Sequence, residues 1–335
     1  MARVKRQIIG RLTVVGLGVE ATRGTAAAIT TLIPFQNYTL RDIIEYIDND
    51  SAFGNISEFN DSVPYRYRSE GDIGGKVFLD LLGTEFTGVF GDPPTTTELV
   101  ANEAYRHDFV MADDNSHQSL TVGVEDSSQN LRYPLVMVNS YTLEASVEAF
   151  LTRTINVMGA PSVDSTDPIN AAYNTNDIEF VPEDIVVTAV NHGTPFTDPS
   201  ARTLNITTFS ITINKNTAVE YTMGRREPVD IVNQQLGVEV SFEGSTINDA
   251  DRQAFRSGIA QALRFRATKN SVWLDTAETL HPQLEIQLPK VAFKEYEKSS
   301  DLNAAATQSI TGQANYDIAT AALIKASITN STASY

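Results

Sequence analysis

Apolar and polar residues alternate with a period of two along most of the strongly patterned segments of this chain. From Leu143 to Leu151 the odd positions are apolar and most even positions are polar. The pattern recurs at 209–213, 236–243 and 284–288, and on even positions between 316 and 328. Such alternation is typical of strands with one buried face, and the frequent Thr, Val and Ile favour pleated structure. The sequence therefore predicts a mainly β protein, a β-sandwich or barrel.

Two segments follow helical spacing instead. Apolar residues recur at this spacing after Thr246 and predict a flanking helix at about 247–265. Thr246 or Asn248 can cap its first turn. A shorter helix is expected at about 79–90, where Gly91 stops it. A sandwich or barrel flanked by two helices accommodates this order of elements.

The composition excludes several classes of function. The chain has 335 residues, of which 41% are apolar, and its formal net charge is −17. Binding nucleic acid by neutralising phosphates requires surplus basic charge, although an acidic surface can surround a polyanion that slides past. Cysteine is absent, which excludes disulfides and thiolate sites. No apolar stretch approaches the roughly 18–20 residues of a membrane helix, so we expect the chain to stay in, or assemble from, a cytosol.

One motif favours an enzyme. Gly16-Leu-Gly18-Val-Glu-Ala21 follows an apolar run and matches the Gly-x-Gly-x-x-Ala fingerprint of dinucleotide-binding proteins. That fold needs a helix directly after the turn, whose first amides face the pyrophosphate, but 22–34 is a Thr- and Ala-rich run ending at proline. A β-turn explains the glycines equally well. A dinucleotide-binding enzyme that uses Gly16–Ala21 is the alternative function.

No other enzyme or metal pattern is complete. Asp48-Asn49-Asp50 begins like a calcium loop, but Phe59 occupies the twelfth position, where that loop requires glutamate. A Gly-x-Ser-x-Gly nucleophile motif is absent, and the four histidines lie far apart in the sequence. We therefore expect no catalytic residue, no cofactor and no metal site.

The segment 37–72 differs from the rest of the chain. It carries eight acidic residues against three arginines, with aromatic residues and no clean periodicity. This character indicates a long loop or an extended arm rather than core. If the arm serves assembly, the candidate contact residues are its acidic and aromatic side chains: Asp42, Glu45, Asp48, Asp50, Phe53, Phe59, Tyr65 and Tyr67.

The order of features along the chain resembles that of a known family. The resemblance begins with Gly18-Val-Glu20-Ala-Thr-Arg23-Gly24-Thr25 and the following Leu32-Ile-Pro34-Phe35. It continues through Glu70-Gly-Asp-Ile73 and the run from Leu82-Gly83 to Gly91, and it closes with Met223-Gly-Arg-Arg-Glu-Pro228, the 236–243 strand and Leu288-Pro-Lys-Val291. Together these features resemble the major tail tube proteins of long-tailed (siphovirus-type) bacteriophages.

The resemblance implies a structural protein of the virion tail, made in the host cytoplasm. Copies would stack as rings, usually of six, around a lumen that passes DNA without specific binding, and neighbouring sheets would join into an inner barrel. It further implies contacts with tape measure, tail terminator and distal tail proteins, and an arm that reaches an adjacent subunit. Another virion β protein, such as a head–tail joining subunit, is a further alternative.

Two domain divisions are compatible with the sequence. The first is one tube domain over 1–335, with the arm at about 37–72 and an insertion at about 161–202. The second is a pair of tube-like halves that divide near residue 165, although no self-similarity at a fixed offset supports a repeat.

Overall fold

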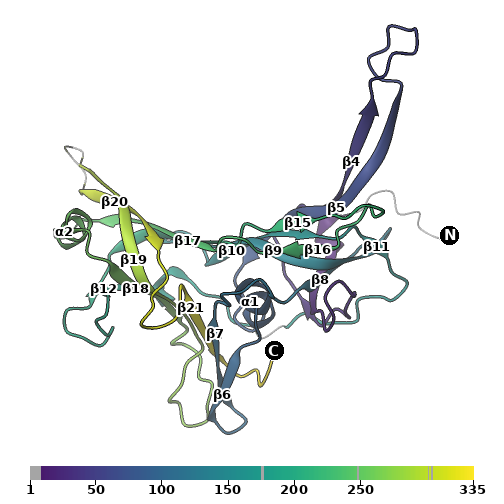
Figure 1. Cartoon of the computed structure of the whole chain (residues 1–335). Coiled ribbons are helices and arrows are strands. Elements are labelled where there is room, and N and C mark those ends of the chain that lie inside the picture. The colour runs from purple at the N-terminus through teal and green to yellow at the C-terminus, as the bar shows by residue number, and fades with distance from the viewer. Residues whose placement is uncertain (1–8, 175–176, 247–248, 301, 303–304) are drawn as a thin grey trace.

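The computed structural model describes residues 9–174, 177–246, 249–300, 302 and 305–335. Strands dominate this part of the chain, and nineteen of its strands join into one hydrogen-bonded network. The expectation of a mainly β fold with sandwiched layers is confirmed. Figure 1 shows a wide body, with one long hairpin projecting from it.

One wide antiparallel sheet crosses the body, and we call it the main sheet. Its strands pair in the order β3/β4–β5–β10–β9–β14–β17–β20–β19. Their bounds are β3 (Asn37–Tyr38), β4 (Arg41–Asn49), β5 (Asp61–Lys76), β9 (Asn130–Ser146), β10 (Thr152–Gly159), β14 (Ile206–Asn214), β17 (Gly237–Ser245), β19 (Gln283–Ser299) and β20 (Thr307–Ala314). The alternation at 209–213 and 236–243 lies in β14 and β17, as predicted. The alternation at 143–151 extends beyond β9, which ends at Ser146, and that between 316 and 328 reaches a strand only in β21 (Lys325–Asn330).

Two smaller groups of strands extend from this sheet. The first part of β9 pairs with β8 (Leu120–Glu125) and β11 (Val163–Asp164), and β8 continues to β1 (Val14–Val19) and β2 (Thr31–Leu32). The first part of β19 pairs with two strands, β18 and β21. This second group contains β18 (Gln261–Thr268), β21 (Lys325–Asn330), β12 (Ile185–Asn191), β13 (Arg202–Thr203), β7 (Ala104–Val110) and β6 (Thr95–Val100).

Three short elements lie outside these groups of strands. A separate ribbon pairs β15 (Ala218–Glu220) with β16 (Asp230–Val232). Two 3-10 turns lie at Gly10–Leu12 and Pro182–Asp184. The first precedes β1, and the second precedes β12.

The core lies between the main sheet and these groups. α1 (Leu82–Phe90) runs through it, and all nine of its residues are buried (Figure 1). The Phe86 ring packs edge-on against Phe90, Phe109 and Tyr141, with ring centroids 5.3–5.8 Å apart. Since the ring belongs to the largest apolar cluster and contacts aromatic residues of β7 and β9, α1 joins the layers. The helix expected at about 79–90 is thus confirmed, and it ends at Gly91 (φ +97°), as predicted.

The helix expected at about 247–265 is present but shorter than predicted. α2 (Ala250–Ser257) ends at Gly258, whose φ of +66° is left-handed. Residues 261–268 form strand β18, in which Arg264 and Arg266 alternate with the buried Leu263, Phe265 and Ala267. Apolar residues at helical spacing overlapped this period-two run, so the sequence prediction of one long helix was wrong in its second half. Residues 247–248, including the proposed cap Asn248, lie outside the described residues.

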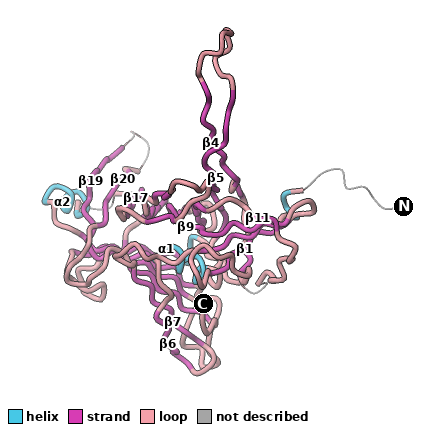
Figure 2. Tube along the Cα trace, turned by 45° about the vertical axis from the view of Figure 1, so that its right-hand side comes forward, coloured by secondary structure: helices cyan, strands magenta, loops and turns pink. Residues whose placement is uncertain are grey.

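The segment expected to be a loop or arm is a β-hairpin. β4 and the first half of β5 pair from Arg41/Glu70 to Asn49/Asp61, and Figure 2 shows this ribbon extending far from the body. The expected insertion at about 161–202 contains β11, the 3-10 turn at 182–184 and β12. β12 pairs with β18 and so belongs to the second group of strands.

Candidate assembly surfaces

The hairpin of residues 41–70, which we call the arm, is fixed to the body at its base. The Asp42 carboxylate accepts hydrogen bonds from the Ser162 N–H (2.8 Å) and hydroxyl (2.5 Å). On the opposite strand the Ser69 hydroxyl donates to the Ala160 carbonyl (2.8 Å), and the Tyr67 N–H donates to the Arg226 carbonyl (2.8 Å). These contacts involve both strands of the arm, so they set its direction relative to the body.

A charged cluster follows above the base. Glu45 forms an ion pair with Arg68 and accepts a hydrogen bond from the Tyr65 hydroxyl (3.0 Å). The hydrogen bonds from Arg68 and then Tyr65 lower the pKa of Glu45. The Arg66 guanidinium lies over the Tyr221 ring, 4.6 Å from its centroid. This cluster joins the two strands and connects them to the segment that follows β15.

The outer half of the arm is apolar and exposed. Ile47 and Val63 face each other across the ribbon and are 58% and 47% exposed, and Ile56 in the tip is fully exposed. The same region exposes Ile44, Tyr46, Phe53 and Phe59. A two-stranded hairpin is marginally stable in water by itself, and contiguous exposed apolar side chains mark an interaction site. The outer half of the arm therefore has the composition of a contact surface.

The predicted arm residues divide between these regions. Asp42, Glu45, Tyr65 and Tyr67 lie in the base and its charged cluster, where they hold the arm in place. Asp48 accepts a hydrogen bond from the Ser62 hydroxyl (2.6 Å) higher up, and Asp50, Phe53 and Phe59 lie at the exposed tip. The aliphatic residues of the same segment, Ile44, Ile47, Ile56 and Val63, were not predicted as contact residues. Their density within an otherwise acidic segment was the signal that could have revealed them.

One face of the main sheet is covered by the core, and the opposite face is open except where the β15–β16 ribbon packs on Met137 and Met158. The covered face packs on α1 and the core, and we call the opposite one the outer face. Cross-strand register places Thr142, Thr212 and Glu239 in one row of this face. Further rows add hydroxyl residues and carboxylates, among them Glu144, Glu243, Glu295 and Glu297. Lys76 also lies there, paired with Glu179 (3.2 Å). The outer face is thus hydrophilic and mostly acidic.

Comparison with known proteins gives one decisive match. The model of the phage tail tube protein family matches residues 10–329, which is nearly the whole chain. The chain belongs to the phage tail tube protein family. No curated protein matches it. As a member of this family it is a structural protein of the phage tail that assembles with copies of itself into a tube.

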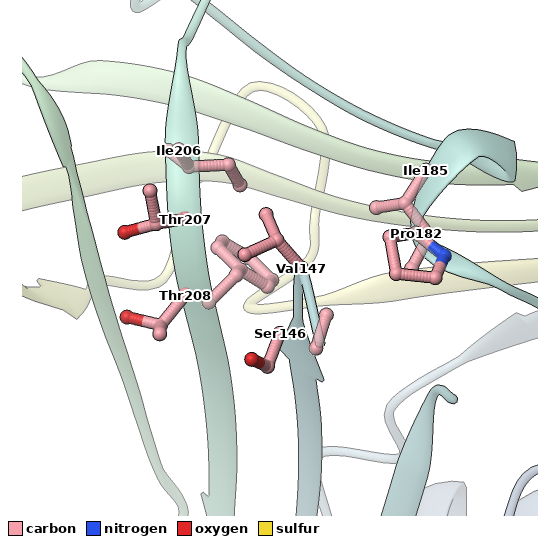
Figure 3. Close-up of a pocket in the computed structure, with 9 residues that line it drawn as sticks. Ser146, Val147, Pro182, Ile185, Ile206, Thr207 and Thr208 are labelled. Carbon is pink, nitrogen blue, oxygen red and sulfur yellow. The ribbon is translucent and has the colours of Figure 1, made fainter. Parts of the chain in front are cut away.

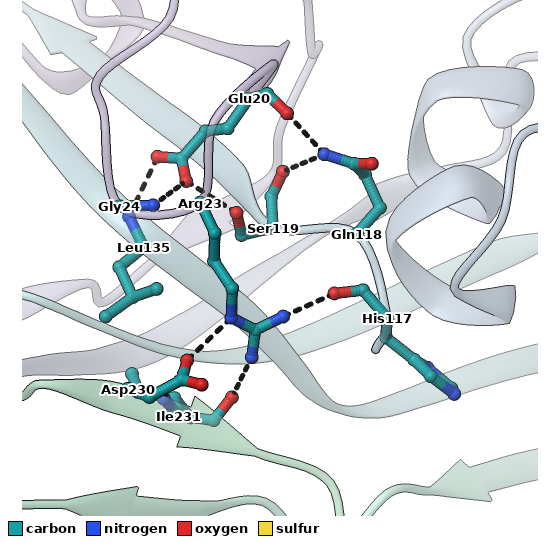
Figure 4. Close-up of polar contacts among 9 residues, drawn as sticks. All are labelled: Glu20, Arg23, Gly24, His117, Gln118, Ser119, Leu135, Asp230 and Ile231. Atoms are coloured by element: carbon teal, nitrogen blue, oxygen red, sulfur yellow. Dashed lines mark hydrogen bonds and ion pairs between the residues drawn. The ribbon is translucent and has the colours of Figure 1, made fainter. Parts of the chain in front are cut away.

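The N-terminal motif of this tail tube protein has a structural role. The Glu20 carboxylate is buried and accepts hydrogen bonds from the Gly24 and Leu135 N–H groups (2.7 and 2.8 Å) and from the hydroxyls of Ser119 (2.5 Å) and Thr121 (2.9 Å). Figure 4 shows most of these partners around Glu20. The carboxylate therefore ties the turn after β1 to β8 and β9.

Arg23 extends this network toward the arm. Its guanidinium donates to the carbonyls of His117 (2.6 Å) and Ile231 (2.5 Å) and pairs with the Asp230 carboxylate (2.6 Å; Figure 4). Asp230 and Ile231 belong to β16, and the neighbouring strand β15 leads into the segment that contacts the arm base. Arg23 thereby connects the N-terminal motif to the support of the arm.

The dinucleotide alternative has no structural basis. Gly16 and Gly18 lie inside β1, which is antiparallel to β8 and β2, and a turn rather than a helix follows. A Cβ at Gly16 would lie 2.5 Å from the Ile29 side chain, and one at Gly18 would lie 2.2 Å from the Ala28 carbonyl oxygen. The glycines therefore let the chain at 27–32 pack directly on β1.

Three ionisable side chains are buried in the body of the tail tube protein. Arg153 of β10 forms an ion pair with Glu85 of α1 (2.8 Å), and both side chains are almost fully buried. Lys215, at the end of β14, is fully buried and donates to the Gly88 carbonyl of α1 (2.8 Å). Burial and then the nearby Arg23 charge lower the pKa of Lys215 to about 7. These contacts anchor α1 to strands of the main sheet.

One surface hollow of the body is lined by apolar and hydroxyl side chains. Figure 3 shows this hollow, of about 50 Å³, at the ends of β9 and β14, where Val147, Pro182, Ile185, Ile206 and hydroxyl residues line it. No ionisable side chain lines it. In the part of the chain that the structure describes, there is no cluster of three metal-ligating side chains. Neither α1 nor α2 has the length or apolar run to span a membrane.

Proposed function

We propose that the chain assembles into stacked rings that form the tail tube of a long-tailed phage, with the outer face of the main sheet lining the lumen through which DNA passes. The resemblance implies rings usually of six copies, and contacts at the tube ends with tape measure, terminator and distal tail proteins. The protein would be made in the host cytoplasm and remain in the virion tail.

The acidic outer face carries this proposal. DNA passing along a surface must not bind it, and carboxylates repel phosphates. Thr and Ser hydroxyls keep the surface hydrated between the carboxylates of Glu144, Glu239 and Glu243. The opposite face of the sheet is covered by core. If the sheets of neighbouring copies close into a barrel, the outer face is therefore the one that is free to face its interior.

The arm supplies the second part of the proposal. Its exposed apolar outer half requires a covering surface, and a neighbouring subunit or ring provides one. Deleting residues 46–64 should leave a folded protein, because the base contacts of Asp42, Tyr67 and Ser69 remain. Negative-stain electron microscopy should then show no stacked tubes. Normal tubes from the deleted protein would overturn this role of the arm.

The lumen assignment has its own experiment. The double substitution Glu239→Lys and Glu243→Lys should let tubes form but make them retain double-stranded DNA at low salt in a sedimentation assay. Asp92→Lys with Glu183→Lys adds the same charge at positions outside the outer face. Tubes of this control should retain no more DNA than the wild type. Equal retention by both variants would contradict the assignment.

The two alternatives receive less support. A head–tail joining subunit would also be a virion β protein, but the family match over residues 10–329 favours the tube. A dinucleotide-binding enzyme is disfavoured because Gly16 and Gly18 are packed inside β1. Titration with nicotinamide and flavin cofactors should give no thermal shift.

A further inference from the structure

The pairing pattern of the main sheet occurs twice along the chain. In the first set the order is β5, α1, β8, β9, β10, where β10 pairs with β5 and β9, and β9 pairs with β8. In the second set the order is β17, α2, β18, β19, β20, where β20 pairs with β17 and β19, and β19 pairs with β18. The hairpin β6–β7 interrupts the first set only.

Local details make the two sets equivalent residue by residue. The 17-residue strands β9 and β19 each have a bulge at a proline, Pro134 and Pro289, and a second bulge nearer their C-terminal ends. After the second bulge, Tyr141 packs on Phe86 of α1, and Tyr296 packs on Phe255 of α2. β10 and β20 have eight residues each. Tyr296 is therefore the counterpart of Tyr141.

The two sets differ at one edge. β9 pairs with β14 on the edge opposite β10, from Thr208/Ser146 to Asn214/Ser140. The corresponding edge of β19 pairs with no strand among the described residues. In the first set, where β14 occupies the edge of β9, every residue of α1 is buried. In the second set, where the edge of β19 is free, Asp251 is the one buried residue of α2. The second set thus lacks the strand that completes the first.

The missing strand has a counterpart at the other end of the main sheet. Residues 37–43 pair with β5 as β14 pairs with β17, and no described strand pairs with their other edge. The register can be followed across the sheet: Arg41 pairs with Glu70 and Thr212 with Glu239. Glu70 and Glu239 in turn pair with Met158 and Gln313, the seventh residues of β10 and β20. Arg41 is thus the counterpart of Thr212.

We propose that residues 39–43 of one copy pair with the free edge of β19 at 295–299 in a second copy, in the register in which β14 pairs with β9. The proposal rests on the proposed tube function and specifies its subunit junction. It places Arg41 opposite Glu297, Thr39 opposite Ser299 and Ile43 opposite Glu295. Each copy would then extend the sheet of the next, which removes both open edges.

Charge complementarity supports this register. Within one chain, Thr142 and Thr212 occupy the matching positions, and their hydroxyls are 3.3 Å apart. At the junction those positions hold Glu297 and Arg41, two exposed residues of opposite charge. Opposite charges directly across an antiparallel pair stabilise it. A one-residue slip would turn these side chains to different faces of the sheet.

Disulfide trapping tests the register, since the natural chain has no cysteine. Arg41→Cys with Glu297→Cys should cross-link under mild oxidation into a ladder of covalent multimers. Within one chain the two positions lie at opposite ends of the main sheet, about 30 Å apart at the usual strand spacing, so only a link between copies can form. Arg41→Cys with Lys298→Cys is the matched control, and it should yield at least about tenfold less multimer.

The outcomes separate this junction from the tube function. Wild-type tubes together with equal cross-linking of the two cysteine pairs would overturn the junction and leave the tube function standing. Absence of both tubes and multimers would overturn both. Charge reversal provides a second measurement: Arg41→Glu and Glu297→Arg should each reduce tube yield, and the double variant should restore it. Failure of the double variant to recover, with both singles folded, would also contradict the register.

Discussion

Glu20 shows how one side chain can fix the N-terminal part of the fold. It lies buried with four hydrogen-bond donors around its two carboxylate oxygens. Glu20→Gln keeps the shape of the side chain, but it removes the negative charge and places an NH₂ group opposite hydrogen-bond donors that the carboxylate oxygens had accepted from. We expect a loss of about 2–4 kcal/mol in the free energy of unfolding, measured by urea denaturation. Glu58→Gln, at the exposed arm tip, should change it by less than about 0.5 kcal/mol. A similar, small effect of both substitutions would contradict the structural role of Glu20.

Lys215 should make the folding stability depend on pH. Burial and the neighbouring Arg23 lower its pKa to about 7, below the value near 10.5 that it has when exposed. Between these values the unfolded state binds more protons than the folded state. Stability should therefore rise between pH 7 and pH 10, by about 1.4 kcal/mol per pH unit at most. Lys215→Met should flatten this rise in urea midpoints measured at pH 7, 8 and 9.

Asp177 should make the folding stability fall, rather than rise, with increasing pH, and it should do so at lower pH than Lys215. Burial first, and then the charge of Asp80, raise its pKa to about 7 from 3.8. The folded state therefore binds more protons than the unfolded state between pH 4 and pH 7, and stability should fall as pH rises through this window. Asp177→Asn should remove the fall while leaving the rise above pH 7. Identical pH profiles for wild type and Asp177→Asn would contradict the assignment.

At the scale of elements, the sequence predicted strands better than it predicted their ends. The alternation at 236–243 predicted β17 correctly because one face of the strand packs on the core. The helix prediction failed beyond Gly258 because Phe255 and Ile259 matched helical spacing by coincidence, and Ile259 is exposed. The arm has apolar residues on both faces, so its strands carry no clean period of two. The neighbouring copy that we propose to cover the arm lies outside one chain, and a single-chain pattern cannot reveal it.

The arm can be tested as an element without removing it. Phe53→Ser, Ile56→Ser and Phe59→Ser combined should leave the urea midpoint nearly unchanged, because all three side chains are exposed in the free protein. The same variant should lose most tube formation in sedimentation and negative-stain measurements, since the apolar contact surface is gone. Ile259→Ser, Val272→Ser and Ile318→Ser remove exposed apolar side chains outside the arm and the segments that contact it, and provide the control. Tube yield that falls equally in both would argue against a specific role of the arm.

At the scale of the whole molecule, the repeated pairing pattern was not predictable from a fixed sequence offset. Tyr141 and Tyr296 are equivalent, and so are Ile73 and Phe242, but the two spacings differ. The β6–β7 hairpin and the 269–282 loop insert chain at different points of the two sets. The polar contacts to the two helices also differ in residue type, because Arg153 donates to Glu85 of α1 whereas Gln308 donates to Asp251 of α2. Only the strand pairings reveal the equivalence.

This equivalence changes the expected number of chains in a ring. The resemblance implies rings usually of six copies, and here we take each position in such a ring to be filled by one set of strands. A chain with two equivalent sets of strands supplies two units, so three chains would fill six positions. Because barrel diameter grows roughly linearly with strand number, six such chains would enclose a barrel about twice as wide. We expect rings of three times the 36.6-kDa chain mass, with three-fold symmetry in end-on electron micrographs. Rings of six chains, measured by native mass spectrometry, would show that the two sets do not occupy equivalent ring positions.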